Sequence, residues 1–123
     1  MDWHVAAWVA TGSAGGGLAR WWISELLTRG DLPWGTLTVN VLGSFLLGLL
    51  LGTEPGTEWV TPAATAAVGV GFLGSFTTMS TFSYETVALG SDGSLGWAIG
   101  YLALTLVACL AGALIGRWGA QSI

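Results

Sequence analysis

Long apolar stretches and short polar separators alternate along the chain. Each apolar stretch has about the 20 residues needed to cross a hydrocarbon core of roughly 30 Å. The four stretches run over residues 4–27, 34–53, 60–89 and 95–117. The separators between them contain two of the three prolines and two of the three aspartates. The pattern predicts an all-α membrane protein that forms one domain of four transmembrane helices, with both termini on the same side.

Tryptophan marks the ends of these stretches. An aromatic belt at the membrane–water interface predicts such a placement. The eight residues are Trp3, Trp8, Trp21, Trp22, Trp34, Trp59, Trp97 and Trp118.

Two of the predicted helices carry a polar stripe. In the second stretch Thr36, Asn40 and Ser44 recur at every fourth position, which places them on one face of a helix. The fourth stretch repeats the spacing more weakly with Tyr101, Thr105 and Cys109. Polar side chains that face lipid are costly, so we expect both stripes to face protein or water.

The third stretch is too long and too polar in its middle for one plain helix. Gly69, Gly71 and Gly74 are followed by the hydroxyl residues Thr77, Thr78, Ser80, Thr81 and Ser83. This composition has poor helix propensity and predicts an interrupted helix. The freed carbonyls of such a break suit a cation, and its amides and hydroxyls suit an anion. A helix merely bent by hydroxyl groups bonded to its own carbonyls is the weaker alternative.

Small residues spaced four apart indicate close helix packing. The pairs are Gly12 with Gly16, Gly96 with Gly100, and Gly112 with Gly116. Such pairs allow the backbones of neighbouring helices to approach each other. Because four helices hardly enclose a pathway alone, we also expect oligomerisation.

Composition and charge exclude several function classes. The chain is 53% hydrophobic and 8% charged, with a net charge of −4 and a mean hydropathy of +0.71. Only Arg20, Arg29 and Arg117 are basic, which argues against nucleic-acid binding. A single cysteine, Cys109, gives no disulfide framework, and a single histidine, His4, gives no metal pair. No nucleophile and base stand at catalytic spacing, so an enzyme is not expected.

Three stretches together resemble the signature segments of the Fluc (CrcB-type) family of fluoride channels. They are GGGLARWW (15–22), PWGTLTVNVLGSFLLG (33–48) and GFLGSFTTMSTFSYE (71–85), in the family's order. The resemblance is strong over about the first 85 residues, whereas the fourth helix fits in length and in its Tyr and Thr positions only. It implies an antiparallel, dual-topology homodimer in a prokaryotic plasma membrane, with two fluoride pores and a central structural sodium ion.

The resemblance also implies roles for individual residues. The sodium ion would be held by the backbone carbonyls of Gly74 and Thr77 from each subunit, and Arg20 would lie near the vestibule. The implied pore residues, with Ser44 added from the polar stripe, are Asn40, Ser44, Met79, Ser80, Thr81, Phe82, Tyr101 and Thr105.

The residue types agree with a fluoride path. Fluoride is small and strongly hydrated, so a selective path needs many neutral donors in place of water. The edge of the Phe82 ring carries partial positive charge and suits an anion. Met79 departs from the family, which has a second phenylalanine there, because a thioether offers no positive ring edge. We therefore expect conduction to survive with a changed rate or selectivity.

The sequence is also consistent with alternatives to a homodimeric channel. A proton-coupled exporter resembling the small multidrug-resistance family would need a carboxylate in mid-span. Every acid instead falls near the end of a predicted stretch. Glu85 is one of these acids, and a solvated carboxylate at a helix end is as consistent with its position as a functional one. A structural subunit of a membrane assembly would explain the glycines but not the stripe of the second stretch. Two arginines on one side against one on the other suit insertion in both orientations, and pairing with a paralogous subunit is left open.

Overall fold

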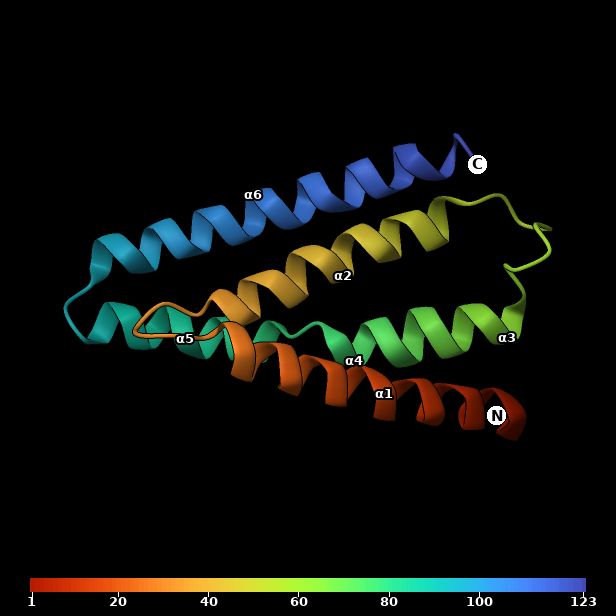
Figure 1. Cartoon of the computed structure of the whole chain (residues 1–123), viewed down its shortest axis with the longest axis horizontal. Coiled ribbons are helices and arrows are strands. Elements are labelled where there is room, and N and C mark those ends of the chain that lie inside the picture. Colours follow the sequence, from red (N-terminus) through yellow and green to blue (C-terminus); the bar gives the residue numbers. More distant parts are fainter.

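Four antiparallel helical segments build the protein, and the computed structural model describes all 123 residues. The first, second and fourth segments are single helices: α1 (Trp3–Leu27), α2 (Trp34–Gly52) and α6 (Leu95–Ala120). Both termini lie at the same end of the bundle, as the even number of crossings predicts (Figure 1). The predicted limits of the helices hold to within three residues.

The third segment is interrupted. It consists of α3 (Pro62–Ala64), the π-helix η1 (Thr65–Leu73), α4 (Gly74–Phe76) and α5 (Met79–Ser91). Residues 77 and 78 separate α4 from α5 and are not helical. The break therefore follows the glycines and falls within the run of hydroxyl residues, where helix propensity is lowest.

Local sequence signals explain where the segments start and turn. The Asp2 carboxylate accepts a hydrogen bond from the His4 amide at 2.9 Å and caps α1. Thr61 caps α3 in the same way at 3.1 Å, with Pro62 in the first turn. The connections before α2 and α6 contain Gly30 and Gly93 at φ 72° and 83°, a conformation that favours glycine.

Two helix pairs pack with their backbones almost in contact. A Cβ atom added at Gly12 or Gly16 of α1 would meet the backbone of η1 at Ala67 or Phe72. At Gly116 of α6 it would meet the Phe45 carbonyl of α2. Only Gly96 and Gly100 of the three predicted pairs face open space. The other two pairs have the packing role that their spacing predicts.

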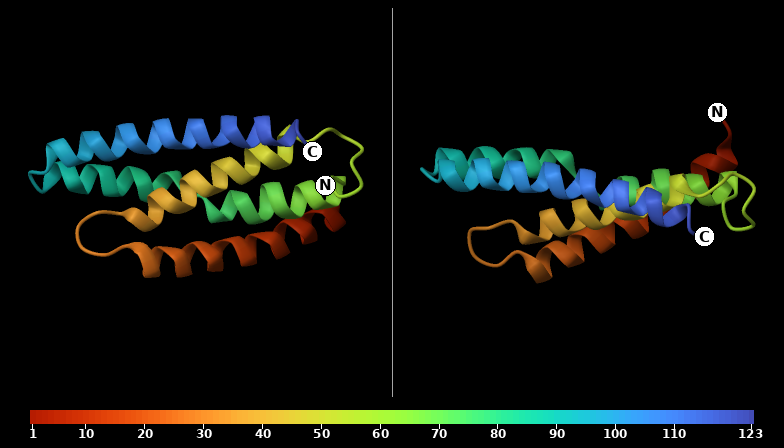
Figure 2. Two further views of the ribbon diagram at one scale, coloured as in Figure 1. Left: turned by 45° about the horizontal axis from the view of Figure 1, so that its top comes forward. Right: turned by 90° about the horizontal axis from the view of Figure 1, so that it is seen from above.

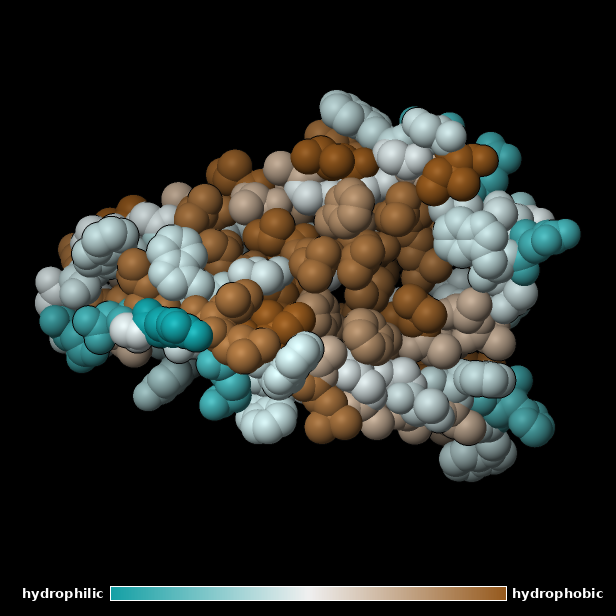
Figure 3. Space-filling model, viewed as in Figure 1, coloured by the Kyte–Doolittle hydropathy of each residue, from teal (hydrophilic) through white to brown (hydrophobic).

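The outer surface is that of a multi-pass membrane protein. Apolar side chains cover the middle of the bundle, and hydrophilic residues gather at its two ends (Figure 3). Three helical segments are long and apolar enough to span a membrane: α2, Pro62–Ser91 and α6. The fourth, α1, has 25 residues but carries Arg20 and Glu25 among small residues.

The two hairpins separate at the end that lacks the termini. Seen from above, the connection between α1 and α2 lies apart from the connection between α5 and α6 (Figure 2, right). A hollow of about 440 Å³ between them is lined by Asp31, Glu85 and Asp92, among others. This end of the bundle is therefore acidic.

Candidate functional site

The break in the third segment is the polar centre of the protein. Thr77 and Thr78 have extended backbone angles, with ψ of 158° and 116°, so the chain leaves one helix and enters the next within two residues. The end of a helix leaves its last carbonyls without intrahelical partners, and the start of the next leaves amides free. Inside a membrane these groups need other partners.

Asn40 supplies partners for the backbone of Thr78. The Asn40 side-chain amide donates to the Thr78 carbonyl at 3.0 Å, and the Thr78 amide donates to the Asn40 Oδ1 at 2.7 Å. Both residues are buried, with 8% of each exposed. The side chain of α2 thus takes the place of a backbone partner. Its NH₂ group has two donors, of which Thr78 uses one.

The side chain of Thr78 caps α5. Its hydroxyl accepts from the Thr81 amide at 3.3 Å and donates to the Thr81 hydroxyl at 3.0 Å. The Ser80 hydroxyl lies 3.4 Å away. Ser80 and Thr81 are themselves exposed on the surface of the single chain. Hydroxyls exposed at this depth are costly against lipid and suit a surface that another protein chain covers.

Carbonyl oxygens at the end of α4 are the groups that the resemblance implies for a cation. The Thr78 amide, which would bond the Gly74 carbonyl in a continued helix, donates to Asn40 instead. The Thr77 carbonyl accepts from the Arg20 Nη1 at 3.3 Å. Carbonyl oxygens fit a sodium ion chemically, but two from one chain are too few to replace its hydration shell. A second copy would have to supply the others, and Arg20 would have to share or leave Thr77.

A cavity of about 340 Å³ opens beside the break, between α2, α5 and α6. No charged residue lines it. Seven residues predicted for the pore and the sodium site line it: Asn40, Ser44, Gly74, Thr77, Met79, Phe82 and Thr105. The Thr105 side chain is 3% exposed, and its hydroxyl is the one buried side-chain polar atom without a hydrogen-bond partner. A buried polar atom without a hydrogen-bond partner is rare in folded proteins.

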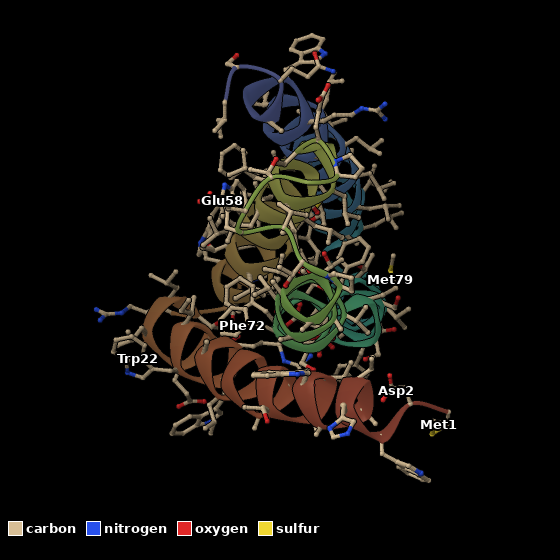
Figure 4. All side chains as sticks on the ribbon, turned by 90° about the vertical axis from the view of Figure 1, so that its right-hand side faces the viewer. Met1, Asp2, Trp22, Glu58, Phe72 and Met79 are labelled. Atoms are coloured by element: carbon tan, nitrogen blue, oxygen red, sulfur yellow. The ribbon has the colours of Figure 1, made fainter.

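Aromatic and sulfur side chains shape the wall of this cavity. Phe82 is buried and packs edge-to-face on Tyr101, with ring centroids 5.2 Å apart at 63°. Met79, one turn earlier in α5, is 67% exposed. Figure 4 shows Met79 and Phe72 on opposite sides of the third segment, so Met79 faces away from the packed interface with α1.

Glu85 is anchored rather than freely solvated. Its two carboxylate oxygens accept from the Thr36 hydroxyl and the Tyr101 hydroxyl, each at 2.8 Å. The three residues come from α5, α2 and α6 and join these helices on the acidic side of the break. Of the two interpretations that the sequence leaves open for Glu85, these contacts favour an anchored carboxylate over a solvated one, and α5 continues for six residues beyond it.

A second hollow of about 500 Å³ adjoins the cavity toward the termini. The two share Ser44 and Leu47, and both lie between α2 and α6. Arg117 and Gln121 line the second hollow at its outer end. The two hollows together therefore extend along α2 from Asn40 past Ser44 to Arg117.

The structure gathers most of the residues predicted for the pore, but not all of them. Ser80, Thr81 and Tyr101 do not line the cavity, and neither does Arg20, which was predicted for the vestibule. Sequence reasoning missed three residues: Thr78, Thr36 and Cys109. Thr78 is of a residue type that commonly caps helices, and Thr36 and Cys109 lie on the predicted stripes.

Comparison with known proteins gives consistent matches over nearly the whole chain. The family described as "CrcB-like protein, Camphor Resistance (CrcB)" matches residues 7–117. A "Fluoride-specific ion channel FluC" of Bordetella petrii is 42% identical over 119 residues, which cover 94% of this chain and 90% of that protein. Proteins of the same name from Methylocella silvestris and Methylococcus capsulatus are 41% and 46% identical. These two matches cover 94% and 88% of this chain, and 92% and 49% of the relatives.

Proposed function

Because the chain belongs to the CrcB-like family, whose compared members are named fluoride-specific channels, we propose that it conducts fluoride selectively and passively across the bacterial plasma membrane. Flow down the electrochemical gradient would remove fluoride from the cell and confer fluoride resistance. The family is one of non-enzymatic transporters, in agreement with the absence of a catalytic pair from the sequence. The proposal also decides against the proton-coupled exporter.

The unpartnered hydroxyl of Thr105 is the observation that carries the proposal. Thr105 lines the cavity together with Ser44 and with Asn40, whose side-chain amide has one donor that Thr78 does not use. These neutral groups can donate hydrogen bonds to fluoride in place of water. Because no charged side chain lines the cavity, the anion is not trapped by an ion pair and can leave.

Phe82 and Met79 would form the next part of the path. The Phe82 ring is fixed by its contact with Tyr101, so it can present a defined edge to the anion. Met79 provides methyl and methylene contacts where a second ring edge would otherwise stand. We infer that this difference changes rate or selectivity rather than abolishing transport.

A second copy completes the proposed channel. Gly74, Met79, Ser80 and Thr81 are exposed together around the break in the single chain, although the surrounding segment spans the membrane. An antiparallel homodimer would cover these groups and bring four carbonyls, from Gly74 and Thr77 of each copy, around one central sodium ion. A paralogous subunit in place of the second copy would cover the hydroxyls of Ser80 and Thr81 equally well.

Fluoride efflux from liposomes tests the proposal. Vesicles that contain the purified protein are loaded with fluoride, and release is followed with a fluoride electrode after the membrane potential is clamped by an ionophore. Rapid release of fluoride, with chloride retained in matched vesicles, is expected. Folded protein that releases no fluoride, alone or with a co-expressed paralogue, would contradict the proposal.

A further inference from the structure

The cavity beside the break gathers sulfur as well as neutral donors. Cys109 of α6 and Met79 of α5 both line it. Apart from Met1, they are the only sulfur-containing residues of the chain. Sulfur has no part in the donor set proposed for fluoride, because a thioether donates no hydrogen bond and a thiol is a weak donor.

Cys109 is open to whatever the cavity contains. Its side chain is partly exposed and lies one turn after Thr105, on the same face of α6. Both residues line the cavity, so an ion that occupies the cavity beside Thr105 also lies near the thiol one turn further along.

We propose that Cys109 and Met79 form a binding site for a soft monovalent cation, of the class of Ag⁺ and Cu⁺, inside the cavity proposed to conduct fluoride. Thiolate and thioether are the ligands that such ions prefer, and two soft donors satisfy their low coordination demand. On binding, the Cys109 thiol loses its proton to water and its sulfur bonds the metal, while Met79 donates a sulfur lone pair. No electron is transferred, and one proton is released for each ion bound.

Occupation of this site would close the path. The cavity is about 340 Å³ in volume, and a cation held by Cys109 and Met79 would occupy part of it. It would also hold the fluoride ion by direct attraction, which opposes the release that the uncharged wall allows. The inference rests on the proposed function for this consequence only, since the metal site itself follows from the two sulfur atoms.

Silver binding tests the site without reference to transport. Ag⁺ is titrated into purified, tag-free protein in nitrate buffer without chloride, and heat and proton release are recorded. The wild type is expected to bind one Ag⁺ per chain with release of one proton, and Cys109→Ser to lose this binding. Met79→Leu, which keeps the side-chain volume but removes the sulfur, should weaken binding about tenfold, or roughly 1.4 kcal/mol.

A displaced thiol is the matched control. The double variant Cys109→Ser, Val107→Cys keeps one cysteine in α6 but moves it to a residue that is 67% exposed and does not line the cavity. It should bind Ag⁺ no more tightly than Met79→Leu. If Met79→Leu or the double variant bound Ag⁺ as tightly as the wild type, the proposed two-sulfur site would be overturned.

Fluoride efflux then separates the two proposals. Ag⁺ is expected to slow efflux in the wild type, and not in Cys109→Ser when each protein is compared with its own silver-free rate. Tight Ag⁺ binding with unchanged wild-type efflux would place the site outside the path and overturn the claim of block. If silver-free vesicles release no fluoride, the channel proposal fails, whereas the binding measurements still decide the metal site.

Discussion

Helices are joined in opposite ways at two places in the protein: the interface between α1 and η1, and the junction of α2, α5 and α6. At the first, glycine allows backbones to touch, and one side-chain hydrogen bond, from Ser13 to the Gly71 carbonyl at 3.4 Å, crosses the contact. At the second, the Asn40 side chain makes two hydrogen bonds to Thr78, and a cavity remains. Within a membrane, shape alone can join helices, whereas room for an ion requires polar groups that hold the helices apart.

The tight interface should break under the smallest added volume. Gly16→Val places a side chain against the Phe72 carbonyl, which cannot move away because it belongs to the backbone of η1. We expect a loss of about 3 kcal/mol in the free energy of unfolding. Thermal unfolding in detergent measures it, with Gly17→Val as the control, because a Cβ there meets nothing within 4 Å. Equal stability of the two variants would show that the contact between Gly16 and Phe72 can adjust to a larger side chain.

At the junction of α2, α5 and α6, we expect an added negative charge to impair fluoride efflux. Asn40→Asp keeps an acceptor for the Thr78 amide but loses the donor to the Thr78 carbonyl, and it places a negative charge beside the proposed path. We expect fluoride efflux to fall about a hundredfold, for roughly 2.7 kcal/mol of added barrier. Circular dichroism and size-exclusion profiles must first show a folded protein. A folded Asn40→Asp protein with normal efflux would remove Asn40 from the path.

The cavity wall should respond more mildly than either helix contact. Met79→Phe replaces a thioether with a ring edge beside Phe82, in the wall of the cavity that both residues line. We expect efflux or the preference for fluoride over chloride to change about threefold, while thermal stability stays the same. Transport and selectivity that are both unchanged would show that this position only packs.

The smallest effect is expected at the outer end of the route. Arg117→Gln removes the cation that lines the second hollow. We expect fluoride efflux to fall by about twofold at low ionic strength and to match the wild type at high salt, because salt screens the attraction. Arg29→Gln is the control, since Arg29 lies at the opposite end and bonds the Leu26 carbonyl. The same loss at both salt concentrations would contradict a steering role.

Much of the fold could be predicted because each relevant signal is local. The helix limits follow from apolar length and from prolines, and the break follows from glycines and hydroxyls placed together. The stripe of Thr36, Asn40 and Ser44 also predicted which face of α2 meets polar groups, as their contacts with Glu85, Thr78 and the cavity bear out.

The partners across the break could not be predicted from spacing. Asn40 and Thr78 are 38 residues apart, and Thr36 and Glu85 are 49 apart, so their pairing depends on how the helices dock. The π-helix of η1 was missed because its glycines resemble those of an ordinary packing motif. The role of Glu85 was left open because its partners, Thr36 and Tyr101, lie on other helices.

The order of the chain has a consequence for biogenesis. Arg20 and Asn40, which bond the carbonyls of Thr77 and Thr78, both precede the break along the sequence. During synthesis, the helices that carry these side chains therefore enter the membrane before the exposed peptide groups arrive. The broken helix meets its partners on entry, and the nascent protein need not hold unsatisfied backbone in lipid while it waits for a later segment.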